Sequence, residues 1–126
     1  MITQNSNGLI GVVGVCASGK STLIKGLSAY GYRCRHIAQE HSYVQDMWQR
    51  LTQPDILIFL HVSFEETKRR KPLNWTIEEY QAQITRLQHA NQHANIHIET
   101  DNLTPEDLLE QALLKIEKFV DKPSVN

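Results

Sequence analysis

Four short apolar segments alternate with helical segments along this chain, and that alternation limits the possible folds more than any other feature. Strands separated by helices favour a parallel sheet with helices packed on its faces. GLIGVVGV is continuous and β-branched, as expected of a central strand that is buried on both faces, and DILIFLHV is the second central candidate. YRCRHIA alternates and carries Arg33 and Arg35 on one face, which suits an edge strand. The predicted strands are 8–15, 32–38, 55–62 and 95–100.

Capping residues mark where the helices begin. SYVQ, SFEE and TIEE place Ser42, Ser63 and Thr76 three residues before Gln or Glu, which is the reciprocal hydrogen-bonding pattern of a capping box. Thr104 followed by Pro105 marks another start. Apolar residues at helical spacing then predict the faces that contact the core. These are Val44, Met47, Trp48 and Leu51 on a short helix 43–51, Ile77, Tyr80, Ile84 and Leu87 on a longer helix, and Leu109, Leu113, Ile116 and Val120 on the last one.

Length and composition fit one domain. The chain has 126 residues, of which 40% are hydrophobic, enough for one core but not for two. We therefore expect a single domain over 1–126, with frayed ends at 1–7 and 121–126.

Charge and targeting signals narrow the partners and the compartment. The formal net charge is −1 without long runs of one sign, which argues against a nucleic-acid binder and against a membrane-surface protein. The start, MITQNSNGLIGVVGV, has neither a basic region nor an apolar stretch long enough for a signal peptide or a membrane span, so a cytoplasmic location is expected. Cys16 and Cys34 are too few for a disulfide framework and lack metal-ligand spacing with the histidines. Both are interpreted as small thiols, buried or half-buried.

The stretch GVCASGKST carries the most specific signal in the sequence. Gly14, four further residues, Gly19, Lys20 and Ser21 match the Walker A pattern G-x-x-x-x-G-K-[ST], with a predicted strand before it and a helix after it. The glycines allow the backbone N–H groups to turn toward a phosphate, and the helix adds the positive end of its dipole. Lys20 supplies an ammonium group to the terminal phosphates, and the Ser21 hydroxyl supplies a ligand for Mg²⁺. Thr22 is placed to reach the α-phosphate.

At these residues the sequence resembles the P-loop nucleoside triphosphatases. PDILIFLHVSFEETKRR resembles the strand and helix that lead into the lid of P-loop small-molecule kinases, and HANIHIETDNLTPEDLLEQALLKI resembles their C-terminal strand, nucleotide-side loop and final helix. Shikimate, gluconate, adenylylsulfate and nucleoside kinases share this layout. The resemblance implies a three-layer α/β fold that binds ATP and Mg²⁺ and transfers the γ-phosphoryl group to a small-molecule acceptor. Ala17 and Ser18, within the loop, would also contact the nucleotide.

The same resemblance implies roles for residues further along the chain. Arg69 and Arg70 stand where such kinases carry lid arginines that neutralise charge on the transferring phosphoryl group, although a solvated basic helix end is the alternative. Asp101, Asn102 and Leu103 stand where family members place the loop that lies against adenine, with a simple helix cap as the alternative.

The chain is shorter than this family pattern. Only 16 residues separate YRCRHIA from DILIFLHV, which leaves no room for a separate Walker-B-type strand or for an acceptor-binding insertion. The lid between Arg70 and Thr76 is only KPLNW. A right-handed crossover could then place 32–38 directly beside 8–14, giving a four-stranded sheet of order 2-1-3-4.

This arrangement predicts which carboxylate organises the magnesium ion. Glu40 follows the second strand at its C-terminal end, where ligands of open α/β sheets gather, so it would lie next to Ser21 and hold a magnesium-bound water. Asp46, on the helix 43–51, is the second candidate.

Two functions stay open at this point: an ATP-dependent small-molecule kinase, and a nucleotide-binding or weakly hydrolysing module. An oligomer or a partner that completes the acceptor site is compatible with both, whereas the absence of an Asn-Lys-x-Asp tetrapeptide argues against a GTPase switch. Gln39, His41 and Tyr43 could touch an acceptor, but solvated loop residues are the favoured interpretation. His89 and His93 have the spacing of a zinc-binding helix without a third ligand beside them, which favours solvent exposure.

Overall fold

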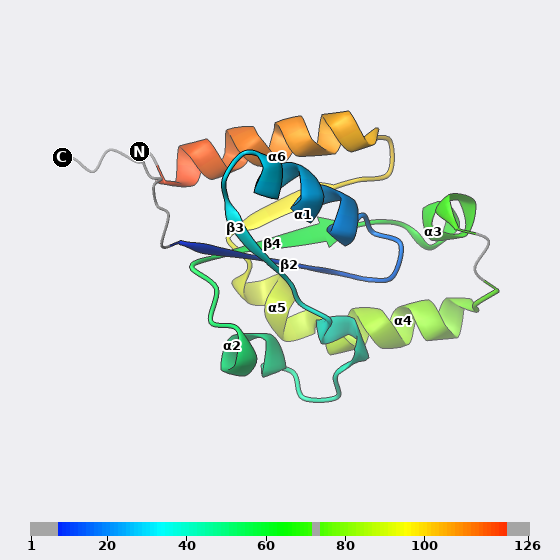
Figure 1. Cartoon of the computed structure of the whole chain (residues 1–126). Coiled ribbons are helices and arrows are strands. Elements are labelled where there is room, and N and C mark those ends of the chain that lie inside the picture. Colours follow the sequence, from blue (N-terminus) through cyan, green and yellow to red (C-terminus); the bar gives the residue numbers. More distant parts are fainter. Residues whose placement is uncertain (1–7, 72–73, 121–126) are drawn as a thin grey trace.

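The protein is an α/β structure built on one four-stranded, all-parallel sheet (Figure 1). A computed structural model describes residues 8–71 and 74–120. The strand order is β3-β2-β4-β5, which is 2-1-3-4 in the order of the four predicted strands, so the predicted topology is confirmed. The strands are β2 (Leu9–Gly14), β3 (Arg33–His36), β4 (Ile56–His61) and β5 (Ile96–Glu99).

The two central strands are buried and the two edge strands are partly exposed. β2 pairs with β3 on one side, where Leu9 lies opposite Arg33, and with β4 on the other, where Ile10 lies opposite Ile56. Arg33 and Arg35 are exposed, as expected for an edge strand.

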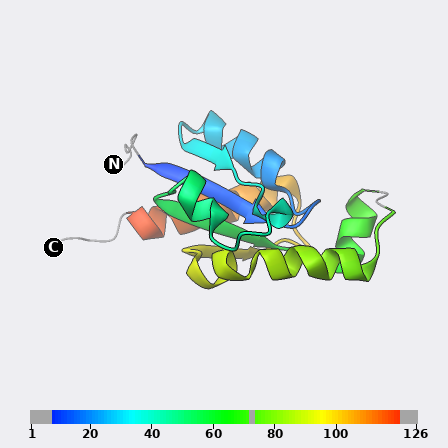
Figure 2. The same cartoon turned by 90° about the horizontal axis from the view of Figure 1, so that it is seen from below.

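Helices cover both faces of the sheet (Figures 1 and 2). α1 (Lys20–Ala29) and α6 (Pro105–Val120) lie on one face, and α4 (Ile77–Arg86) and α5 (Gln88–His93) lie on the other. Side chains alternate along a strand, so Ile58 and Leu60 of β4 enter the core beneath α1 and α6, whereas Leu57 and Phe59 enter the opposite core. The sheet is therefore shared by two apolar layers.

Three of the four predicted helix starts are confirmed. Ser63 caps α3 (Phe64–Arg70) by accepting the Glu66 N–H, and Thr76 forms a complete capping box with Glu79 at the start of α4. The Thr104 hydroxyl accepts the Asp107 N–H at the start of α6.

The predicted helix 43–51 is confirmed only in its second half, and its predicted start at Ser42 was wrong. A 3₁₀ turn, η1 (Gln39–His41), is followed by irregular backbone and then by α2, which covers only Met47–Leu51. The Ser42 hydroxyl accepts the N–H of Val44 instead of capping a helix, and the Gln45 side chain reaches Thr85 O and His89 N–H. Tertiary hydrogen bonds therefore replace the expected capping box.

The predicted core faces are only partly correct. On the 43–51 segment Trp48 is buried, whereas Val44 and Leu51 are exposed. On α4, Ile77 and Ile84 are also exposed.

The described part of the chain contains no helix that is both long enough and apolar enough to cross a membrane. The predicted frayed ends, 1–7 and 121–126, lie outside the described residues.

Candidate functional site

The loop between β2 and α1 turns sharply around close backbone contacts. A Cβ atom on Gly14 would lie 2.5 Å from Ser18 Oγ and 2.9 Å from Leu60 O, so only glycine fits there. Gly19 has φ 104° and Ala17 has φ 67°, both in the left-handed region. Both glycines were predicted to be needed for their backbone freedom, and this reason holds for Gly19. Gly14 is needed for a different reason, because there is no space for a side chain.

The N-terminus of α1 leaves donors at this loop. The first four N–H groups of an α-helix have no acceptor within the helix, and α1 has neither a side-chain cap nor an acidic residue in its first turn. α3 and α4, in contrast, have Ser or Thr caps and Glu residues in their first turns. Two loop N–H groups are already used, because Cys16 N–H donates to Gln83 Oε1 and Ser18 N–H donates to Val15 O. The open end of α1 favours an anion.

Lys20 is buried at the base of this loop. Its Nζ donates to Gly14 O at 2.7 Å and to Val15 O at 3.0 Å, and it lies 3.2 Å from Glu40 Oε2. The ion pair is almost completely enclosed, because only 5% of the Lys20 side chain and 4% of the Glu40 side chain are exposed. The ammonium group is therefore held by three oxygen atoms at the floor of the site.

Glu40 reaches the site because β3 lies directly beside β2. η1 follows β3 and turns the carboxylate inward, where Oε1 is buried without a hydrogen-bond partner. Glu40 and Ser21 line the same cavity. Asp46 does not line it and instead pairs with Arg50 at 3.0 Å.

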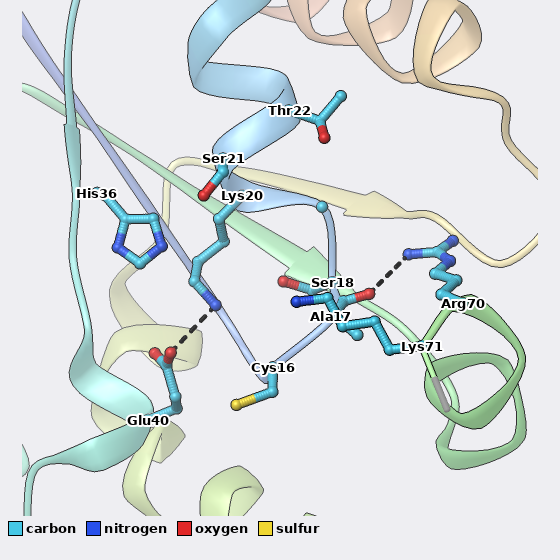
Figure 3. A pocket seen from close by; sticks show the side chains of 11 residues that line it. Cys16, Ala17, Ser18, Lys20, Ser21, Thr22, His36, Glu40, Arg70 and Lys71 are labelled. Atoms are coloured by element: carbon cyan, nitrogen blue, oxygen red, sulfur yellow. Dashed lines mark hydrogen bonds and ion pairs between the residues drawn. The ribbon is translucent and has the colours of Figure 1, made fainter. Parts of the chain in front are cut away.

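The cavity has a volume of about 370 Å³, and Figure 3 shows side chains of the β2–α1 loop, the first turn of α1 and the end of α3 around it. Its lining includes both charges of the buried pair and one arginine of α3. The lining residues are Cys16, Ala17, Ser18, Gly19, Lys20, Ser21, Thr22, His36, Glu40, Arg70 and Lys71.

The two arginines at the end of α3 have different environments. Arg70 Nη1 donates to Ala17 O at 3.1 Å, as Figure 3 shows, and Nη2 donates to Thr100 O. The Arg69 side chain is 76% exposed, and its guanidinium pairs with Glu66 of the same helix. Hydrogen bonds from Arg69 and then Arg70 lower the pKa of the Glu66 carboxyl. Arg70 is therefore part of the cavity, and Arg69 is not.

The three consecutive residues predicted near adenine have different surroundings. Leu103 lines an adjoining cavity of about 290 Å³, which shares Gly19, Thr22 and Arg70 with the first. Asp101 lines neither of these cavities, because its carboxylate accepts the Ser63 N–H at 2.8 Å. Asn102 is exposed and lines neither cavity.

Several side chains near the cavity were not singled out in the sequence as site residues. Cys16, His36 and Lys71 line it, and Gln83 of α4 holds the Cys16 backbone from below. Cys16 lies within the Walker A pattern, at a position where the pattern specifies no residue type, whereas no spacing pattern marks His36 or Gln83, which the crossover connections bring to the loop. Only the resemblance could have indicated Lys71, which follows the paired arginines.

The residues that were weighed as acceptor contacts have different surroundings. Gln39 is buried rather than solvated, and its amide donates to Val44 O and Arg86 O while accepting the Trp48 N–H. Tyr43 is exposed, as expected for a loop residue, and its ring lies beneath the Arg86 guanidinium.

The two histidines of α5 pack against Trp48. His89 is half-buried and accepts a hydrogen bond from Trp48 Nε1 at 3.0 Å, whereas His93 is exposed. Their predicted exposure is therefore correct for His93 only.

No protein-family model matches this chain, and no curated protein matches it.

Proposed function

We propose that this chain is a P-loop nucleotide-binding protein that binds MgATP and acts as a small-molecule kinase. The buried ammonium of Lys20 beneath the uncapped end of α1 is the observation that carries this proposal. The uncapped end of α1 favours a polyanion at the mouth of the cavity, and Lys20 would bind its terminal phosphates by exchanging one of its three oxygen contacts. The close packing at Gly14 and the left-handed backbone at Gly19 support the same interpretation, since a phosphate cradle requires close approach of the backbone.

The residues present fit a triphosphate with its magnesium ion. The loop from Gly14 to Thr22 would hold the phosphates, and Ser21 and Glu40 would hold the metal, with Glu40 acting through a water. Arg70 would neutralise charge on the transferring group, and Leu103 would lie on the base side. MgATP supplies the phosphoryl group, and the protein contributes position and charge.

A nucleotide-binding module without efficient transfer is the second candidate. It is favoured by the short connection between β3 and β4, which contains only η1 and α2 as helical elements. This connection adds little surface with which to enclose an acceptor, so a partner or a second copy would complete the site.

Binding of MgATP to the purified protein, measured by calorimetry, tests the proposal. Truncating Lys20 alone would leave Glu40 buried without its counter-charge, so the double variant Lys20→Met/Glu40→Gln removes both charges together. We expect this variant to bind MgATP at least about tenfold more weakly, roughly 1.4 kcal/mol. Lys25→Met is the matched control, because Lys25 is an exposed lysine of the same helix.

Unchanged affinity in a folded double variant would contradict the P-loop assignment. A screen of small acceptors for ADP release then separates the two candidates. Acceptor-stimulated turnover supports a kinase, whereas tight binding with only trace hydrolysis supports the module.

A further inference from the structure

Three side chains of different chemistry meet at the edge of the cavity floor. Cys16 comes from the β2–α1 loop, and Glu40 and His41 come from η1. One ligand atom from each lies within 4.8 Å of the other two, and among the described residues no other group of three such side chains is this compact. We propose that Cys16, Glu40 and His41 form a binding site for a zinc-class divalent metal ion, which shares Glu40 with the magnesium site of the proposed function and takes its other two protein ligands from Cys16 and His41.

The distances suit a tetrahedral ion. His41 Nε2 lies 3.9 Å from Cys16 Sγ and 3.7 Å from Glu40 Oε2. Ligands at zinc bond lengths in tetrahedral geometry are separated by about 3.4–3.6 Å. Small side-chain movements are therefore enough to close the site around an ion. Three protein ligands leave a fourth position for water or for a further ligand.

The buried carboxylate is the independent observation that points to a ligand. Glu40 is almost wholly enclosed, yet its Oε1 has no hydrogen-bond partner. A buried acceptor without a partner is costly, and a cation bound at this carboxylate would satisfy it.

Neighbouring amides already hold the ligands in place. Gln83 Nε2 donates to Cys16 Sγ at 3.2 Å, while Gln83 Oε1 accepts the Cys16 N–H at 3.0 Å. These two hydrogen bonds fix both the backbone and the sulfur of Cys16. Gln39 fixes η1 through Val44 O and Arg86 O, and Figure 3 shows the Cys16 sulfur on the side of Glu40. Hydrogen bonds from neighbouring groups typically orient the ligands of metal sites in this way.

Titration with Zn²⁺ and with Co²⁺, in the absence of nucleotide and magnesium, tests this site apart from the proposed function. We expect one equivalent to bind, with release of about one proton as the Cys16 thiol becomes a thiolate. Co²⁺ should give a sulfur-to-cobalt charge-transfer band. Cys16→Ser should abolish this band, and His41→Ala should weaken metal binding at least about tenfold. His41 is 58% exposed, so its truncation should leave the fold intact.

Two matched variants control for the other thiol and for another histidine of the cavity. Cys34→Ser should keep the band, because Cys34 lies on β3 outside the cluster and burial raises the pKa of its thiol. His36→Ala should also keep it, since His36 lines the cavity but is not part of the cluster. A charge-transfer band that survives in Cys16→Ser would overturn the proposal. Metal binding to the unaltered protein without any sulfur band would overturn it as well, and would indicate a histidine pair such as His61 and His97.

Discussion

At the residue scale, Lys20 and Glu40 are a buried ion pair whose two members depend on each other unequally. Lys20 keeps Gly14 O and Val15 O as acceptors even without Glu40. Glu40 without Lys20 would keep only the exposed His41 near Oε2, and its Oε1 has no partner at all. Burying Glu40 without its counter-charge should therefore cost more free energy than burying Lys20 without its counter-charge.

This asymmetry predicts the order of stability among variants. Lys20→Met should lower the free energy of unfolding by about 3–5 kcal/mol, because a carboxylate remains buried without compensation. Glu40→Gln should cost less, about 1–3 kcal/mol, because the ammonium keeps two carbonyl partners. The double variant should lose about 0.5–3 kcal/mol less free energy of unfolding than the two single variants lose together. Urea unfolding of all four proteins measures this coupling, and simple additivity would show that the pair is not coupled.

The sequence could predict some of these residues but not their burial. The Walker A match identified Lys20 and Ser21, and the strand order placed Glu40 at the same cavity as Ser21. The pattern could not show that Lys20 is enclosed, because that depends on the neighbouring η1. Asp101 was expected on the nucleotide side, yet its carboxylate caps the N–H of Ser63, which lies 38 residues earlier.

At the element scale, one arginine connects α3 with the β2–α1 loop and with the residue that follows the last strand. Arg70 donates to Ala17 O in the β2–α1 loop and to Thr100 O just after β5, and it also pairs with Glu66. Arg69, one residue earlier on α3, points to solvent. Helical geometry rotates successive residues by about 100°, so only one of two adjacent arginines can face the cavity.

Arg70→Ala and Arg69→Ala therefore form a matched pair. Arg70→Ala should lower the thermal midpoint clearly, because three contacts are lost and two backbone carbonyls lose a donor. If the protein transfers phosphate, turnover should also fall at least about tenfold while affinity for MgATP changes little. Arg69→Ala should leave both quantities nearly unchanged, because exposed ion pairs contribute little. Equal effects from the two variants in melting and turnover assays would contradict this distinction.

Local patterns predicted the helices well where a cap acts within its own helix. Thr76 and Thr104 start α4 and α6 as expected, because their partners lie three residues away. The segment after β3 could not be predicted in this way. There Gln39 and Gln45 bond to Arg86 O and Thr85 O, more than 30 residues further on, and these distant contacts decide the backbone. Tertiary hydrogen bonds overrode the local signal.

At the scale of the whole molecule, the order 2-1-3-4 assembles the cavity. Because β3 pairs with β2 without an intervening strand, the residues that follow β3 lie beside the β2–α1 loop. The same order makes β2 and β4 central, so both apolar layers pack on shared strands. A sheet that is common to both layers should couple their unfolding.

Ile116→Ala tests this coupling from one layer to the other. Ile116 of α6 is fully buried in one apolar layer. The two tryptophans of the chain report on the opposite layer, because Trp48 belongs to it and Trp75 packs against it. The substitution should lower the free energy of unfolding by about 2–5 kcal/mol. The midpoints from tryptophan fluorescence and from far-ultraviolet circular dichroism should shift together, because one cooperative domain loses both layers at once.

Leu114→Ala on the exposed side of α6 is the matched control and should change stability by no more than about 0.5 kcal/mol. If the dichroism midpoint of Ile116→Ala fell while the tryptophan midpoint stayed in place, the two layers would unfold independently. Such a result would contradict the single domain expected from the length and composition of the chain, because the tryptophans report on the layer that Ile116 does not contact. A common shift would instead show that the two layers, which pack on the shared strands β2 and β4, unfold as one cooperative unit.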